Sequence, residues 1–327
     1  MRPMRALCLL AVYLSALAIL SAGNAKPPGA AGAASRPASR AASRSASQPA
    51  TSAAKVYQAW PFDANEAARR QEATAKALGV KRELVFEFDG NVAMKLVLVP
   101  AGRFMMGSPK DEKERFDDEG PRHEVTITRP FYMGVCDVTQ GQFALMMGWN
   151  ASQFRDPNNP VEFVTWKDAA AFCKAVSEST GLSVRLPTEA EWEYACRAGS
   201  ATPFNTGDTI SVEQANYDGD YVYGEGVTGK CLRQTTPAGS YKPNAFGLCD
   251  MHGNVWQWCS DWYDDDYYAN SPKTDPAGPK KGEFRVMRGG SWFVNPWSCR
   301  SAFRGTYRPV HGNFAIGFRV VCEVAGR

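Results

Sequence analysis

The chain has 327 residues, with 37 lysines and arginines against 34 aspartates and glutamates, and a formal net charge of +3. Six of the cations and none of the acids lie in residues 1–54, so the rest of the chain holds 31 cations and 34 acids. The part of the chain that is able to fold is therefore slightly acidic. This charge distribution predicts no nucleic-acid binding, because the positive excess belongs to one N-terminal tail.

Residues 1–25 have the pattern of a secretory signal peptide. Arg2 and Arg5 precede an apolar run from Ala6 to Ala22, and Gly23-Asn24-Ala25 supplies small residues for cleavage after Ala25. An uncleaved anchor is the alternative, since about 17 apolar residues is the lower limit for a membrane span. We expect a secreted, periplasmic or cell-envelope protein with no transmembrane span after signal removal.

Residues 26–54 consist almost wholly of Ala, Ser, Pro, Gly and Arg. Such a segment buries too little apolar surface to offset its ordering entropy, so we predict a disordered linker. Residues 55–82 are predicted to be a helical extension, with one helix between Tyr57 and Gly79. Asp63 is its expected N-cap, with Glu66 three residues on, and Gly79 is expected to end it.

Several further elements follow in the remaining residues, 83–327. Residues 84–88 and 92–99 flank Asp89-Gly90 and predict a hairpin, because Asp-Gly suits its turn. The acidic stretch 111–119 is interpreted as a solvated loop rather than a metal site. Helices are predicted over 139–147, over 166–180 and from Thr188. In the last of these we interpret the acids as helix-capping and structural groups rather than acid–base catalysts: Glu189, Glu191 and Glu193.

A tryptophan-dense stretch from Phe246 to Trp292 marks the centre of the folded domain. It opens with FGLCDMHGNVWQWCSDWY and closes with RVMRGGSW. The alternation in Val255-Trp256-Gln257-Trp258 predicts a strand. GNVWQW, RGGSW, the upstream RLPTEAEWEYACR and the terminal GFRVV occur in an order that resembles the formylglycine-generating enzyme (sulfatase-modifying factor) superfamily. The resemblance runs from about Leu96 to Cys322 and implies an α+β fold similar to the C-type lectin domain.

The resemblance also bears on copper. Formylglycine generators oxidise a cysteine of a sulfatase with molecular oxygen and Cu(I) held by two cysteines, and two soft thiolates select that ion. In the family the first cysteine lies three residues beyond the serine of GGS and the second five further on. Here these positions are Val294 and Cys299. One thiolate does not form a two-coordinate site, so we expect no generator activity from this arrangement. Cys299 is the one catalytic candidate, and its alternative is a structural cysteine.

Three further residues are placed by the resemblance near the substrate groove: Trp256, Ser291 and Arg304. An aromatic wall, a hydroxyl and a cation are suited to hold a peptide or a small polar ligand. The alternative for all three is core packing and strand pairing.

Calcium is the second ion that the resemblance implies. Its expected ligands are Asp250, Gly253, Val255 and Gln257, and oxygen ligands at this spacing suit calcium. Gln257 stands where the family usually has Glu, which weakens the site by one charge. A second family site would use Asn216 and the carbonyl of Tyr217. Its acid position is Lys230 here, so we expect that site to be lost unless Asp218 and Asp220 compensate.

Eight cysteines remain after removal of the signal peptide, and an even number in an exported protein favours disulfides. The lectin-like resemblance implies the pair Cys173–Cys322. Cys196–Cys299 is the next pair, with Cys259 as an alternative partner of Cys299, and Cys231–Cys249 is a guess.

Two functional classes follow. The first is an exported, divergent or non-catalytic member of the family that binds a peptide or small polar ligand. The second is a formylglycine-generating oxidoreductase, whose partner would be a sulfatase or another exported polypeptide.

Overall fold

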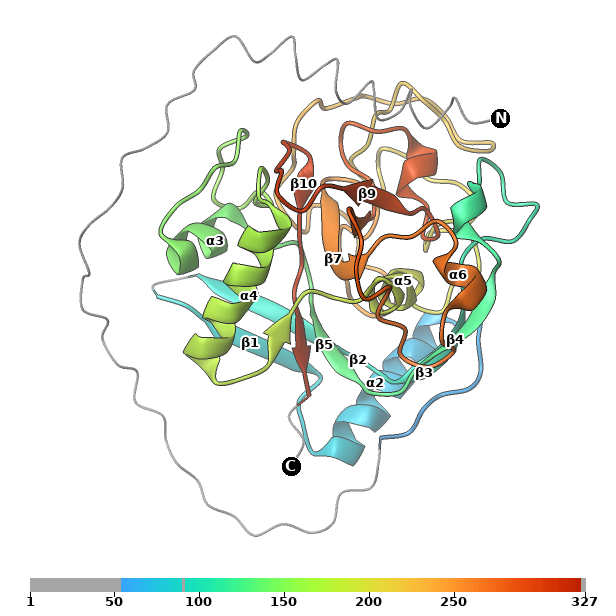
Figure 1. Ribbon diagram of the computed structural model, residues 1–327, viewed down its shortest axis with the longest axis horizontal. Coiled ribbons are helices and arrows are strands. Elements are labelled where there is room, and N and C mark those ends of the chain that lie inside the picture. The colour runs from blue at the N-terminus through green and yellow to red at the C-terminus, as the bar shows by residue number, and fades with distance from the viewer. Residues whose placement is uncertain (1–53, 90–91, 325–327) are drawn as a thin grey trace. The chain divides into compact units, whose positions relative to one another are not determined.

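The structure is a computed structural model that describes residues 54–89 and 92–324. The predicted signal peptide and nearly all of the predicted linker lie outside the described residues. Three sheets and a few helices make up the described part, in an α+β arrangement (Figure 1). Within it, none of the helices has both the length and the apolar character needed to span a membrane.

Helix α2 (Ala64–Leu78) lies within the predicted range 57–79. Asp63 caps it by accepting the backbone N–H of Glu66 at 2.8 Å, and Gly79 ends it in the left-handed conformation. Both caps confirm the prediction. Residues 57–62 precede the helix, and the backbone of Tyr57 pairs with the strand at Gly102. The side chain of Gln71 joins this helix to the domain by donating to the carbonyls of Leu98 and Phe246, each at 2.9 Å.

The largest sheet has five strands, and the predicted hairpin forms its first two. Helix α4 lies across one face of this sheet, as Figure 1 shows. The strands are, in spatial order, β1 (Glu83–Glu87), β2 (Ala93–Val99), β5 (Phe131–Gly134), β11 (Val321–Glu323) and β6 (Val184–Arg185).

The second sheet contains the tryptophan-dense strand and the strand before the glycine pair. Its spatial order is β10 (Ile316–Gly317), β7 (Trp256–Trp262), β8 (Arg285–Arg288) and β9 (Gly305–Tyr307). A separate two-stranded sheet pairs β3 (Gly102–Met106) with β4 (His123–Ile127).

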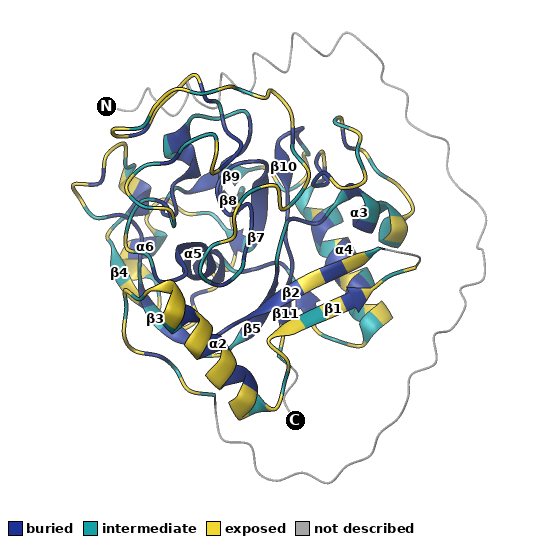
Figure 2. Ribbon diagram, turned by 180° about the vertical axis from the view of Figure 1, so that it is seen from behind, coloured by how far each residue is buried: buried dark blue, intermediate teal, exposed yellow. Residues whose placement is uncertain are grey.

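The remaining predicted helices are confirmed nearly to the residue. Each begins at a threonine whose hydroxyl accepts a backbone N–H three residues on, and each of the three forms a capping box. Helix α5 is buried along its whole length, which Figure 2 shows in dark blue. The helices are α3 (Gln140–Met147), α4 (Trp166–Thr180), α5 (Glu189–Arg197), the short α6 (Tyr267–Asn270), and the 3-10 turns η1 (Asp117–Glu119) and η2 (Pro296–Cys299).

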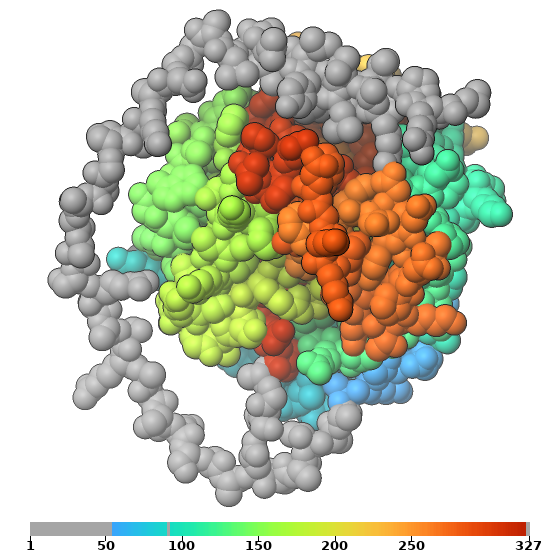
Figure 3. Space-filling model, viewed as in Figure 1, coloured from blue at the N-terminus to red at the C-terminus, as the bar shows by residue number. Residues whose placement is uncertain are grey.

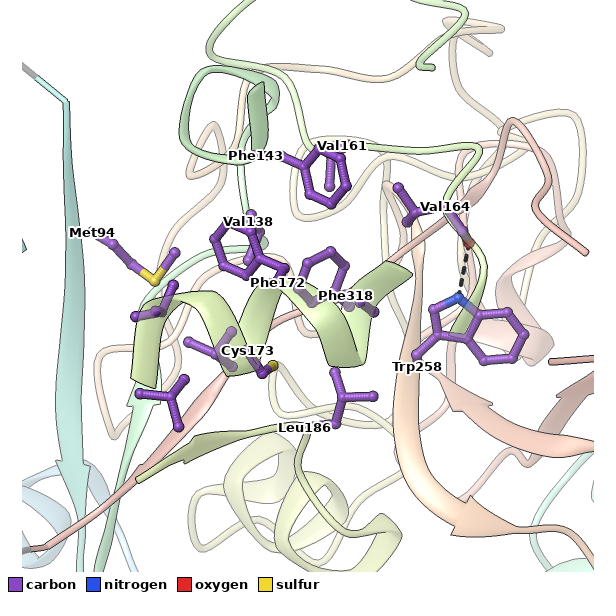
Figure 4. Packing of buried hydrophobic residues seen from close by; sticks show 14 of the residues in the cluster. Met94, Val138, Phe143, Val161, Val164, Phe172, Cys173, Leu186, Trp258 and Phe318 are labelled. Carbon is purple, nitrogen blue, oxygen red and sulfur yellow. Dashed lines mark hydrogen bonds between the residues drawn. The ribbon is translucent and has the colours of Figure 1, made fainter. Parts of the chain in front are cut away.

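A hydrophobic core joins α3 and α4 to both large sheets. Phe172 lies 5.7 Å from Phe143 and 5.4 Å from Phe318 between ring centres. Trp258 packs near the N-terminal end of α4, and its indole N–H is donated to the carbonyl of Val164 at 3.1 Å (Figure 4). On the face drawn in Figure 3, the segments after residue 250, in orange and red, lie against the green segments of α3 and α4. This core holds the tryptophan-dense strand in place.

The acidic stretch 111–119 is only partly the solvated loop that its composition predicts: Asp111, Glu114 and Asp117 are exposed, but Glu112, Asp118 and Glu119 are buried. Glu119 is fully buried and pairs with the Arg300 guanidinium at 2.6 and 2.8 Å, and Glu112 binds the same guanidinium. Burial raises the pKa of Glu112, while Arg300 counteracts that rise. A cation 180 residues away in sequence accounts for the burial of these acids, so the local composition could not reveal it.

Candidate functional site

The two motifs that carry the resemblance meet in space. Strand β8 ends at the glycine pair, where Gly289 and Gly290 have φ angles of +98° and +74°. The carbonyl of Gly289 accepts the N–H of Gly253 at 2.7 Å, and the N–H of Trp292 is donated to the carbonyl of Asn254 at 2.9 Å. The left-handed turn after β8 therefore brings the residues after Ser291 against the loop that precedes β7.

Cys299 is placed where it cannot act as an accessible thiolate. It ends η2, is fully buried, and its Sγ lies 3.9 Å from the carbonyl of Asn295. Burial raises the pKa of its thiol to about 12, although the backbone at Ser291 and Gly253 opposes that rise. Val294 is half-buried on the segment before η2 and offers no soft ligand. The donor set therefore does not fit the two-thiolate copper clamp of a formylglycine generator.

The three predicted groove residues, Trp256, Ser291 and Arg304, are buried. Trp256 packs on Phe303 with ring centres 5.7 Å apart, and the Ser291 hydroxyl accepts the N–H of Phe293 at 3.4 Å. Arg304 donates to both carboxylate oxygens of Glu189, at 2.8 and 3.0 Å. In this structure the three side chains make packing and ion-pair contacts, and their role in a ligand groove stays a prediction.

Helix α5 supplies the acids of a buried ionic cluster. Glu189 pairs with Arg304 and accepts the hydroxyl of Tyr268, whereas Glu193 pairs with Arg197 at 2.9 Å and with Arg288. Glu191 closes the capping box of the helix and binds Arg185 outside it. The interpretation of these three glutamates as structural groups is confirmed.

Asp261 borders this cluster and gives it a pH dependence. It lies on β7 and accepts the N–H of Glu189 at 2.9 Å and the Ser260 hydroxyl at 3.0 Å. Burial, followed by the negative charge of Glu189, raises its pKa to about 7. The unfolded chain releases this proton near pH 4, so the stability present below that pH is lost as the pH rises through about 7.

We expect Asp261→Asn to reduce this loss, because the amide keeps an acceptor oxygen but cannot ionise. Between pH 5 and 8 the free energy of unfolding should fall less in the variant than in the wild type, by on the order of 2–4 kcal/mol. Urea unfolding at four pH values measures it, with the exposed Asp208→Asn as control. Glu162, whose pKa burial also raises to about 7, titrates in all three proteins and cancels. Equal slopes in variant and wild type would refute this assignment.

One of the predicted calcium ligands, Gln257, already accepts hydrogen bonds from two donors of the chain. The side-chain oxygen of Gln257 accepts the Trp192 indole N–H and the Nε of Arg319, both at 2.6 Å. The same guanidinium donates to the carbonyl of Asp250 at 3.3 Å. A buried cation of the chain thus lies beside the expected ligands, whereas Asp250 Oδ1 is buried without a hydrogen-bond partner. Calcium binding by the set Asp250, Gly253, Val255 and Gln257 stays a prediction. No cluster of three or more metal-ligating side chains occurs in residues 54–89 and 92–324.

Asn216, the ligand expected at the second calcium site, is buried against the loop that contains Asn254. Its side-chain amide N–H groups are donated to the backbone carbonyl of Gln234 and to the side-chain oxygen of Asn254. Its backbone carbonyl accepts the backbone N–H of Asn254. Its side-chain oxygen has no hydrogen-bond partner. That one oxygen is available to a ligand, but the acid that the family places beside it is Lys230 here.

A cavity of about 330 Å³ opens beside the residues that follow Ser291. Two carboxylates, one guanidinium, one thiol and two aromatic rings form its walls. The N–H of Asp218 is donated to the carbonyl of Val294 at 2.9 Å. This bond fixes the acidic wall of the cavity against residues 294–299, which hold the two positions of the family's copper ligands and which we call the copper segment. We call the cavity the acidic–aromatic pocket, and it is lined by Asp218, Asp220, Cys231, Arg233, Trp292 and Phe293.

The sequence predicts Asp218 and Asp220 only as calcium ligands. It contains no local pattern that marks Arg233 or Phe293 as part of a site. The acids lie about 75 residues before the aromatic pair, and no local pattern links the two. Only the contact between Asp218 and Val294 makes them one site.

All eight cysteines in the described part of the chain are free thiols. The predicted pairs Cys173–Cys322 and Cys196–Cys299 therefore remain predictions about oxidation. Cys196 and Cys299 are close enough for the first to raise the pKa of the second, and both contact His252. The guess Cys231–Cys249 does not match the structure, because Cys231 lines the pocket and the thiol neighbour of Cys249 is Cys136.

Comparison with known proteins places this geometry in context. Residues 81–324 match the sequence model described as the sulfatase-modifying factor enzyme 1-like domain. The formylglycine-generating enzyme of Streptomyces coelicolor is 32% identical over 282 residues, covering 68% of this chain and 87% of the relative. The serine/threonine-protein kinase pkn1 of Chlamydia pneumoniae is 32% identical, but the match covers only 38% of that protein. The structure of PvdO from Pseudomonas aeruginosa superposes with a TM-score of 0.64 at 34% identity, covering 75% of this chain and 99% of that one.

Proposed function

This chain belongs to the sulfatase-modifying factor family, and from that premise we propose that it is an exported, divergent member that binds a peptide or small polar ligand and does not generate formylglycine. The observation that carries the proposal is the state of the copper segment. Val294 replaces the first soft ligand, and Cys299 is fully buried in η2 with a raised pKa.

The acidic–aromatic pocket supports a binding function for the same region. Asp218 and Asp220 supply negative charge, and Trp292 and Phe293 supply flat apolar surface at the pocket wall. Carboxylates pair with guanidinium or ammonium groups, and aromatic faces also attract such cations. Arg233, which also lines the pocket, suits a carboxylate. A polypeptide segment with a basic side chain has the matching chemistry, and an exported polypeptide such as a sulfatase is the partner we propose.

The catalytic alternative is tested with a peptide of the form Cys-x-Pro-x-Arg. The purified protein is loaded with one equivalent of Cu(I), and aldehyde is measured by mass spectrometry under oxygen. We expect no aldehyde above the protein-free baseline, with the Streptomyces coelicolor relative as positive control. Aldehyde formation by the wild type that disappears in Cys299→Ser would overturn the proposal in favour of the oxidoreductase.

Binding is measured separately with the same peptide and no copper. Tryptophan fluorescence reports on the pocket because Trp292 lines it. We expect the double variant Asp218→Asn and Asp220→Asn to weaken binding by about 30-fold, since each lost charge-assisted bond removes on the order of 1 kcal/mol. Asp208→Asn, an exposed acid outside the pocket, should bind like the wild type. Equal affinity of the double variant and the wild type would exclude this pocket as the binding site.

A further inference from the structure

Two cysteines that lie 113 positions apart in sequence meet just beyond the end of β5, the central strand of the large sheet. Cys136 follows β5, and Cys249 precedes the loop that leads to β7. The neighbouring thiol of Cys249 raises the pKa of the Cys136 thiol, and that of Cys136 lowers the pKa of the Cys249 thiol. Neither cysteine belongs to the copper segment, and neither lines the acidic–aromatic pocket.

The backbone holds these two residues together independently of their side chains. The N–H of Cys249 is donated at 2.8 Å to the carbonyl of Val135, the residue before Cys136. The guanidinium of Arg319 then joins both segments, donating to the carbonyl of Gly134 at 2.9 Å and to that of Cys249 at 2.7 Å. Arg319 is fully buried, so this arrangement is fixed by the core.

A third segment closes around the pair. The N–H of Gly239 is donated to the carboxylate of Asp250 at 2.6 Å, and a Cβ added at Gly239 would lie 3.1 Å from the Sγ of Cys136. Cys136 is half-buried, whereas Cys249 is 9% exposed. The pair is thus packed on one side and reachable from solvent on the other, unlike the fully buried Cys196, Cys259, Cys299 and Cys322.

We propose that Cys136 and Cys249 form a redox-active dithiol that closes to a disulfide by exchange with a disulfide-bearing donor. One protein thiolate attacks a donor sulfur and displaces a donor thiolate. The second protein thiolate then attacks the mixed disulfide and displaces the other donor thiolate. The two protein thiols lose two electrons and two protons, and the donor disulfide takes them up as two thiols. The bond would fix the start of the β7 loop to the end of β5.

The experiment uses the full chain, reduced and then equilibrated in buffers of oxidised and reduced glutathione. Free thiols are alkylated, and the protein is mapped by peptide mass spectrometry without reduction. We expect a cross-linked peptide pair containing Cys136 and Cys249, and a rise in the unfolding temperature of about 5–15 °C on oxidation. Cys231→Ser is the matched control, because Cys231 is also half-buried. This variant should leave both results unchanged.

The variants Cys136→Ser and Cys249→Ser should each lose the cross-linked peptide and the part of the temperature rise that belongs to it. If either variant fails to fold, the wild type alone decides, because its reduced and oxidised forms are mapped in the same buffers. A bridge from Cys249 to Cys231, or full alkylation of Cys136 and Cys249 under oxidising conditions, would overturn the proposal. These outcomes are independent of peptide binding and of aldehyde formation, so this inference and the proposed function are tested separately.

Discussion

Replacing Glu193 by Gln is expected to destabilise the fold by about 3–5 kcal/mol, because it leaves two buried cations without their shared anion. Glu193 is fully buried on α5 and binds Arg197 at 2.9 Å, the guanidinium of Arg288, and the N–H of Gly107 at 2.9 Å. Burial alone would raise its pKa, but Arg197 and Arg288 hold it below the ordinary value. The amide keeps the shape and one acceptor oxygen but loses the charge.

The free energy of unfolding is measured in urea at pH 7. Glu178→Gln is the matched control, since Glu178 forms an exposed pair with Lys174 one turn away and should change stability by less than about 0.5 kcal/mol. If Glu193→Gln costs no more than the control, the cluster does not depend on this charge.

Gly253→Ala is expected to cost about 2–5 kcal/mol for a different reason. Gly253 has a φ of +80°, which an alanine adopts at a cost of about 1–2 kcal/mol. Its added Cβ would lie 2.3 Å from the backbone carbonyl oxygen of Asn216, and overpacking against fixed atoms costs about 1–3 kcal/mol more. The backbone cannot move away freely, because the N–H of Gly253 is bonded to Gly289 at 2.7 Å.

Gly148→Ala separates the two contributions. Gly148 ends α3 with a φ of +78°, and a Cβ there would meet no atom within 4 Å. This control should cost about 1–2 kcal/mol, the conformational part alone. Thermal or urea unfolding of both variants gives the difference, and similar losses would mean that the Asn216 segment yields to the extra methyl group.

Much of the local structure could be predicted from short stretches of residues. The caps at Asp63 and Thr188 satisfy backbone N–H groups within three or four positions, so neighbouring residues suffice to specify them. The hairpin β1–β2 follows from alternation around a turn dipeptide. The pairing of Tyr57 could not be predicted in the same way, because its partner Gly102 is 45 positions away in sequence.

The sequence by itself determined the family, the helices and the loss of one soft ligand at Val294, because each of these depends on residue identity at fixed spacing. Tertiary structure decided the environment of the candidate side chains. It buries Arg304 against Glu189 and sets Arg319 beside Gln257, and it joins Asp218 to the segment after Ser291. Burial and electrostatic partners come from residues tens or hundreds of positions away, so only the folded chain could show which of these groups are free to meet a ligand.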